Sequence, residues 1–169
     1  MKPKISLLSI DPGHREIGYA HFDGDELVDY GVKSLRRHRP KKNSLNILKA
    51  VMERFLTEKS PSVIAIEKNS FAHINQNLPV MQVIRAIHRI AEKNNISIVE
   101  FAPNTIKKEV CNDGRAIKRE VAKFICARYP ELIAYRDSDK AWRERFYSNM
   151  FDAIACGLTY LRLHGKDSK

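Results

Sequence analysis

The sequence predicts an α/β fold with one mixed five-stranded sheet, a three-stranded antiparallel meander plus two parallel strands, flanked by helices. Three short apolar runs separated by turn residues open the chain. Stretches with helical periodicity then alternate with two further apolar runs. With 169 residues, 43% of them hydrophobic, the chain is long enough for one core and too short for two full-sized ones. We therefore expect a single domain over residues 1–169.

The meander is expected in the N-terminal part of the chain. Residues 5–10 are apolar enough for a buried strand, and residues 17–22 form a second strand after the turn signal at residues 11–13. Residues 23–25 are a hairpin signal that leads into a third strand over residues 26–32.

The middle of the chain is expected to alternate between helix and strand. Apolar residues recur at helical spacing from Leu45 to Leu56, and residues 60–61 end this helix before a strand over residues 63–66. A second helix has its apolar positions between Val83 and Ile90, and a fifth strand follows over residues 96–101.

The C-terminal part is predicted to be helical, with one less regular segment. A short helix begins at Pro103 and breaks at residues 112–114. The next helix is expected to face the core with Ile117, Val121 and Phe124. Residues 129–147 show no clear period. A last helix follows and is expected to bury five residues: Phe151, Ile154, Ala155, Leu158 and Leu161.

The charge balance indicates a polyanionic partner. Lys and Arg number 30 against 20 Asp and Glu, which gives a formal net charge of +10 at pH 7. A basic protein of this kind attracts nucleic acid through steering and counterion release. Solubility alone would also account for the excess of positive charge.

The sequence also predicts an unexported protein with no membrane partner. The three cysteines are odd in number and widely spaced, which favours neither a disulfide framework nor a zinc pair. The apolar run that ends at residue 10 is too short for a signal peptide, and no segment approaches the roughly 20 apolar residues of a membrane span. We expect a cytoplasmic location, or the interior of an organelle or host.

Two carboxylates stand where predicted strands end. Asp11 and Glu67 each follow a short apolar run. If the two strands are neighbours, a strand spacing of about 4.8 Å brings the carboxylates close enough to share a metal ion. Asp11 before a proline also suits a plain turn. A turn explains Glu67 less well, because Glu is depleted in strands.

A third carboxylate, Asp152, lies in the apolar run MFDAIACGLTYL. Taken alone, it is typical of an acid in the first turn of a helix, where the helix dipole favours negative charge. Together, the three acids suit one or two Mg²⁺ or Mn²⁺ ions, which take oxygen ligands and leave positions for water and substrate phosphate.

Several short motifs occur in one order along nearly the whole chain: IDPG and GYA, VIAIE before a loop with Phe71, PNTIKKEV, DGRAIKREV and DAIACGL. Each is weak alone, but the ordered set resembles the RuvC family of Holliday junction resolvases. The resemblance implies a ribonuclease H-like fold, a homodimer, and hydrolysis of phosphodiesters at four-way DNA junctions. It implies dependence on Mg²⁺, with Mn²⁺ as a substitute and two ions in each active site. Carried over, it assigns metal binding and catalysis to Asp11, Glu67 and Asp152.

One position departs from the pattern of this family. The family usually has a further Asp or His one helical turn before the last acid, where this chain has Asn149. Asn149 and Asp152 would face the same way on a helix, so the Asn149 carbonyl oxygen could ligate a cation without adding negative charge. The alternatives are a site of three acids alone, or recruitment of Asp137 or Asp139.

Three lysines match positions that the resemblance assigns to contact with the DNA backbone and to charge stabilisation: Lys107, Lys108 and Lys118. A cation beside the leaving oxygen stabilises the charge that develops in the transition state. Lys118 is the candidate for a catalytic role. The alternative for each is an ordinary exposed lysine on a helix.

Other basic and aromatic residues are candidates for DNA contacts. Arg115, Arg119 and Lys123 recur at every fourth residue, which predicts one basic stripe along a helix. Residues 30–52 contain no acid and predict either a solvated loop or a phosphate-contacting surface. Phe71 either anchors its loop or, as the resemblance implies, stacks on an unpaired base, an interaction of about 1–3 kcal/mol.

Three other functions fit parts of the sequence. Asp-x-Gly on a first strand also opens sugar kinases and actin-like ATPases, but these need a second such domain to enclose a nucleotide. A catalytically weak or inactive protein could bind branched DNA, and a related nuclease could act on flaps or hybrids. The three acids favour a metal-dependent endodeoxyribonuclease that resolves four-way junctions as a homodimer. The sequence leaves open its cutting preference and any helper ATPase.

Overall fold

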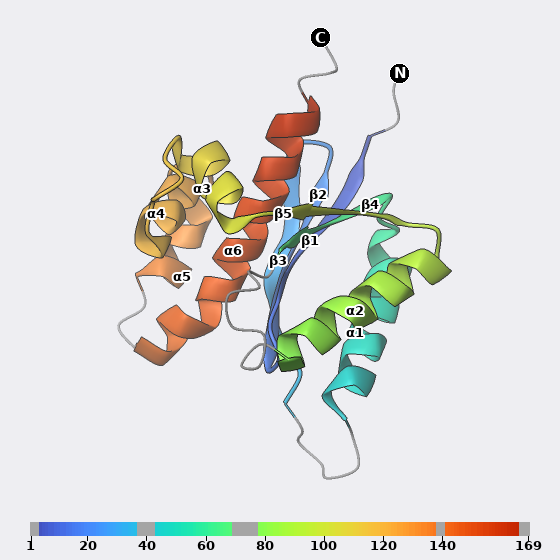
Figure 1. Cartoon of the computed structure of the whole chain (residues 1–169). Helices are drawn as coiled ribbons and strands as arrows, with labels where there is room; N and C mark the ends of the chain where they lie inside the picture. Colours follow the sequence, from blue (N-terminus) through green and yellow to red (C-terminus); the bar gives the residue numbers. More distant parts are fainter. Residues whose placement is uncertain (1–3, 37–42, 69–77, 138–140, 166–169) are drawn as a thin grey trace.

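The structure, a computed structural model, describes residues 4–36, 43–68, 78–137 and 141–165, with side chains in the last stretch from residue 146. It has three layers, in which helices cover both faces of a central sheet (Figure 1). No helix within these stretches is both long and apolar enough to cross a membrane.

The sheet has the predicted number and directions of strands. Its order is β3 (Glu26–Ser34), β2 (Glu16–Asp23), β1 (Ser6–Pro12), β4 (Val63–Glu67) and β5 (Ser97–Phe101). The first three strands along the chain pair antiparallel, and β4 and β5 run parallel to β1. The prediction of a meander extended by two parallel strands is therefore confirmed.

One face of the sheet is covered by α1 (Ser44–Lys59) and α2 (Leu78–Lys93). Both helices carry apolar residues at helical spacing, as predicted from the sequence. Their buried side chains are Leu48, Met52, Phe55, Val83, Ile87 and Ala91. They pack against alternate residues of the strands: Leu8, Ile10, Ile17, Tyr19, Ile64 and Ile66.

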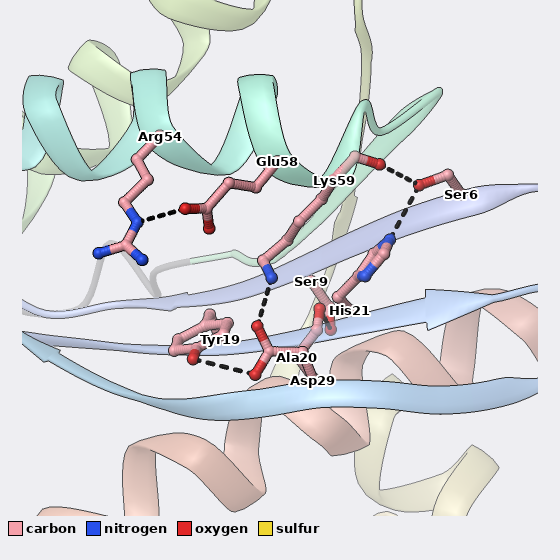
Figure 2. Close-up of polar contacts among 9 residues, drawn as sticks. All are labelled: Ser6, Ser9, Tyr19, Ala20, His21, Asp29, Arg54, Glu58 and Lys59. Atoms are coloured by element: carbon pink, nitrogen blue, oxygen red, sulfur yellow. Dashed lines mark hydrogen bonds and ion pairs between the residues drawn. The ribbon is translucent and has the colours of Figure 1, made fainter.

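A polar cluster fastens the end of α1 to this face (Figure 2). The Lys59 side chain is only 8% exposed and forms an ion pair with Asp29. Tyr19 donates a hydrogen bond to Asp29 over 3.3 Å, and burial together with Asp29 raises the pKa of Tyr19 to about 12. Ser6 donates to the Lys59 carbonyl, so His21 Nε2 must donate to the Ser6 hydroxyl. These bonds fix the register of α1 against β1, β2 and β3.

The opposite face is covered by α3 (Pro103–Cys111), α4 (Lys118–Arg128) and α6 (Ala141–His164). Two short elements follow α4 along the chain and precede α6: a turn of 3₁₀-helix, Pro130–Leu132, and α5 (Ile133–Arg136). The α6 helix lies directly on the sheet, with α3 and α4 beside it (Figure 1). Its buried residues include Met150, Phe151, Ile154, Ala155 and Cys156.

Two predictions about the fourth helix are wrong. Ile117 is 61% exposed because it precedes the first residue of α4, and Phe124 is 49% exposed. Val121 is buried as predicted, but the inward face is completed by Ala122, Ile125 and Cys126. At about 100° per residue the four buried positions span an arc of about 140° that begins at Val121, and Phe124 lies about 60° outside it, beyond Val121.

The less regular segment expected over residues 129–147 is largely helical. It contains Pro130–Leu132, α5 and the first turns of α6, which begins at Ala141. The start of α6, AWRERFY, has no clean apolar period, but it contains strong helix formers. The sequence pattern therefore placed the start of the last helix too late.

Candidate active site

The strand β1 delivers Asp11 to one end of the sheet. β1 continues through Asp11 and Pro12, so the predicted turn at residues 11–13 is wrong and the chain turns only after Pro12. Asp11 pairs with Gly18 of β2. The pairing of β1 with β4 ends at Ile10, so Pro12, which lacks a backbone donor, interrupts no bond to β4.

Register and pleat bring Asp11 and Glu67 together. Ile10 pairs with Ile66 in the parallel β1–β4 ladder, so the residues that follow them lie side by side. Side chains alternate between the two faces of a strand. Asp11 and Glu67 therefore share the face that α6 covers, and the conditional prediction that their strands are neighbours is confirmed.

Two glycines let α6 come close enough to add Asp152. A Cβ atom on Gly18 would lie 1.8 Å from the backbone oxygen of Asn149. A Cβ atom on Gly157 would lie 2.7 Å from the Ser9 hydroxyl oxygen. The helix therefore lies directly on β1 and β2, and Asn149 sits over the Gly18 that pairs with Asp11.

The electrostatics indicate that the three acids share one site. Burial, followed by the charges of Asp152 and Glu67, raises the pKa of Asp11 well above its usual value. Burial and then Asp152 raise the pKa of Glu67 to about 7. Asp152 contributes to raising the pKa of both Asp11 and Glu67, so the three carboxylates lie within electrostatic range of one another.

Lys118 is the cation of the site. Its ammonium forms an ion pair with Asp152 and a 3.3 Å hydrogen bond to the Ser148 hydroxyl. Burial acts to lower the pKa of Lys118, but Asp152, Asp11 and Glu67 outweigh it and raise the pKa. Among the described residues, no three His, Cys, Asp or Glu side chains stand ready in a metal-coordinating arrangement. In the structure, the charge of Asp152 is balanced by the Lys118 ammonium.

The donor set nevertheless fits a divalent ion. Asp11, Glu67 and Asp152 offer carboxylate oxygens, and the backbone of Asn149 lies over Gly18, the β2 partner of Asp11. Hard cations such as Mg²⁺ and Mn²⁺ take such ligands. The raised pKa values of Asp11 and Glu67 show that their charges lack compensation, which a bound cation would supply.

The other residues predicted for the site do not all lie close to the three acids. Lys107 is close enough to lower the pKa of Glu67, whereas Lys108 is exposed one position further around α3. Arg115 is not on a helix: it lies in the turn before α4, where its N–H donates to Asp113. The predicted stripe therefore shortens to Arg119 and Lys123. Phe71 lies outside the described residues.

Of the two alternative acids, only Asp137 lies among the described residues, and it pairs with Arg136. Asp137 accepts two hydrogen bonds from Arg136, at 2.6 and 2.7 Å, and this pairing lowers the pKa of Asp137. Asp139 lies outside the described residues.

Two residues at the site were not predicted from the sequence. Ser148 receives the Lys118 hydrogen bond. Cys156 is fully buried, and burial, with Glu67 and Asp11 nearby, raises the pKa of its thiol well above the usual value. Its spacing of four residues from Asp152 on a helix is the signal that could have found it.

The pKa of Glu67 predicts a pH effect on stability in the absence of divalent ions. Between about pH 4.5 and pH 7, folded Glu67 holds a proton that the unfolded chain has lost, so the free energy of unfolding should fall as pH rises. The Glu67 contribution is at most about 3 kcal/mol. Urea unfolding with a chelator at both ends of this window, on wild type and Glu67→Gln, measures it. An equal pH slope in both proteins would contradict the assignment.

Comparisons with known proteins identify one family. The family model of crossover junction endodeoxyribonuclease RuvC matches residues 7–137. The crossover junction endodeoxyribonuclease RuvC of Akkermansia muciniphila is 30% identical over 162 residues, which are 93% of this chain and 90% of that protein.

Two solved structures have the same fold. Thermus thermophilus RuvC in complex with Holliday junction substrate has a TM-score of 0.73 at 21% identity, over 94% of this chain and 96% of that one. The yeast mitochondrial Holliday junction resolvase Ydc2 has a TM-score of 0.71 at 15% identity, over 97% and 80%. The predicted ribonuclease H-like fold is confirmed. Because the family model covers more than half of the sequence, the chain belongs to the RuvC family of crossover junction endodeoxyribonucleases.

Proposed function

We propose that this protein is a structure-selective endonuclease that resolves four-way DNA junctions by metal-dependent hydrolysis of phosphodiesters. The observation that carries the proposal is the convergence of Asp11 and Glu67, on the sheet, with Asp152 of α6 and with Lys118 beside them, in a chain of the RuvC family. A cluster of buried carboxylates would repel a phosphodiester unless cations stood between them.

The cofactor in this proposal is Mg²⁺, with Mn²⁺ as a substitute and two ions in each site. Asp11, Glu67 and Asp152 would hold the ions, with Asn149 as a neutral ligand. Such ions lower the pKa of bound water and stabilise charge on the attacking and leaving oxygens. Lys118 lies beside Asp152 and would place a positive charge near the leaving oxygen.

The assembly in this proposal is a homodimer of single-domain subunits, each spanning residues 1–169. A four-way junction is resolved by two cuts in strands of like polarity, and a two-fold dimer presents two equivalent sites. The protein would act where junction DNA is found, in the cytoplasm or the interior of an organelle or host. Basic surfaces that include Lys107 and Arg119 would supply affinity for the phosphate backbone.

The proposal is tested with four DNA substrates of the same arm sequence: a four-way junction, a linear duplex, a flap and an RNA–DNA hybrid. With Mg²⁺ or Mn²⁺ we expect paired cuts in the junction and little cleavage of the others. Equal cleavage of linear duplex would contradict junction selectivity. Tight junction binding without cleavage of any substrate would indicate a structural DNA-binding protein instead.

Asn149→Asp is expected to reduce the Mg²⁺ concentration needed for half-maximal cleavage by about tenfold, because a carboxylate adds a charged ligand beside Asp11 and Asp152. A Mg²⁺ titration of the cleavage rate measures this. Asn46→Asp makes the same change on an exposed position of α1, on the other face of the sheet, and should leave the titration unchanged. No difference between the two variants would remove Asn149 from the ligand set.

A further inference from the structure

A small cavity adjoins Asp152. It has a volume of about 80 Å³ and is lined by residues in or next to α4, α5 and α6. These helices lie on the other side of the sheet from α1 and α2 (Figure 1). Eight residues line it: Lys118, Arg119, Ala122, Tyr135, Arg136, Ser148, Phe151 and Asp152. We call it the α4–α6 pocket. Its volume exceeds the space that one water needs several times over.

The charges of the α4–α6 pocket favour an anion. Three of its lining residues are cations, and the one anion among them, Asp152, already pairs with Lys118. Arg136 is held in place by a two-point ion pair with Asp137, which lies outside the lining and offsets part of the positive charge, so the cations still outnumber the acids by one. Arg119 is the third cation and is exposed at the start of α4.

The uncharged residues that line the α4–α6 pocket favour specific binding of a tetrahedral oxyanion over non-specific attraction of a counterion. Tyr135 and Ser148 contribute hydroxyl groups, which can donate hydrogen bonds. The Tyr135 ring packs edge-on against Tyr147 at 4.9 Å between centroids, so its position is set by the core. Ala122 and Phe151 are buried and form an apolar floor, which strengthens charge interactions above it. One arginine guanidinium can donate two parallel hydrogen bonds to two oxygens of the same phosphate.

We propose that the α4–α6 pocket binds a phosphate of the DNA strand next to the scissile phosphate, and that Arg119, Arg136 and Ser148 position that strand over the acids. The inference rests on the proposed function, because Asp152 and Lys118 belong to both the pocket and the active site. A phosphate anchored beside Asp152 would fix the distance between the next phosphodiester and the carboxylates.

The test replaces single phosphates of the cleaved strand by neutral methylphosphonates, one position at a time around the cut. For wild type we expect one flanking position where neutralisation lowers kcat/KM and junction affinity about tenfold. In Arg119→Gln and Arg136→Gln the loss at that position should shrink to about twofold or less, because the partner charge is already gone. Affinity is measured without divalent ions, so the scan also works without cleavage.

Lys123→Gln is the matched control, since it removes one charge from α4 one turn beyond Arg119 and outside the pocket lining. It should weaken binding slightly at every substrate and keep the tenfold position. Ser148→Ala retains all charges and should reduce the same positional loss in part. The melting temperatures of all variants verify folding.

The outcomes separate the two proposals. A wild type that neither prefers nor cuts junctions overturns the proposed function. A wild type that cuts junctions, with the same methylphosphonate profile in Arg119→Gln, Arg136→Gln and Lys123→Gln, overturns the pocket alone. A flat profile together with inhibition by a 5′-phosphorylated oligonucleotide that Arg136→Gln relieves would indicate a site for product termini, and it also overturns the strand-positioning role.

Discussion

Asp11→Asn is expected to lower the rate of junction cleavage by about a thousandfold or more while the protein still binds junctions. Asp11 lies at the end of β1, between Glu67 on the neighbouring strand and Asp152 on α6. The amide has nearly the shape of the carboxylate, so packing against α6 is retained. What is lost is one negative ligand at the centre of the cluster.

The same variant should be more stable than wild type when no divalent ion is present. Burial, Asp152 and Glu67 all disfavour the charged form of Asp11, so a neutral side chain removes an unfavourable interaction. An enzyme that loses activity and gains stability has lost a functional charge, whereas a damaged fold would lose both. Stability near neutral pH should therefore be measured with a chelator, beside the cleavage assay.

Asp25→Asn is the control for this comparison. Asp25 is exposed in the β2–β3 turn, away from the acid cluster, and its substitution makes the same chemical change. We expect wild-type cleavage and wild-type stability from it. Cleavage by Asp11→Asn at more than about a tenth of the wild-type rate would remove Asp11 from the active site.

The pairing of Asp11 with Glu67 could be predicted from the sequence because it depends on local rules. Each acid follows a short apolar strand, and strands of one parallel pair end at the same edge. That the two strands are neighbours was the condition of this prediction, and the β1–β4 ladder fulfils it. The prediction failed locally only at Pro12, where an X-Pro-Gly string indicated a turn although Pro12 still lies in β1.

The contacts around Asp152 could not be predicted in this way. Its partner Lys118 is 34 residues earlier in the chain, and no spacing rule links an α4 residue to an α6 residue over that separation. Phe124 shows the same limit in the core. Its apolar spacing predicted burial, but the buried face of α4 includes Ala122 and Cys126 instead, and Phe124 is 49% exposed.

Gly18 makes a close contact with α6 that the pattern of a strand cannot identify. In the sequence it is one small residue of the run IGYA, and glycine within a strand indicates a bulge or a close approach by another backbone. The structure identifies the close approach. The backbone of α6 at Asn149 and Met150 occupies the space that any other side chain would need.

Gly18→Ala is accordingly expected to destabilise the protein by about 3 kcal/mol or more. The new Cβ would lie 1.8 Å from the Asn149 oxygen and 2.8 Å from the Met150 nitrogen. Both are backbone atoms, so no rotamer change relieves the overlap, and β2 or α6 must move. The melting temperature should fall by roughly 6–12 °C.

Two other glycines set the scale for this result. A Cβ on Gly157 would meet fully buried side-chain atoms of Phe22 and Ser9, at 2.3 and 2.7 Å, so Gly157→Ala should also destabilise the protein. A Cβ on Gly165 would meet no atom within 4 Å, and Gly165→Ala should be nearly neutral. Because a displaced α6 carries Asp152 with it, Gly18→Ala should also lose cleavage at temperatures where it is still folded. If Gly18→Ala were as stable and active as Gly165→Ala, then α6 would not lie on β2, and the placement of Asp152 over Asp11 and Glu67 would be wrong.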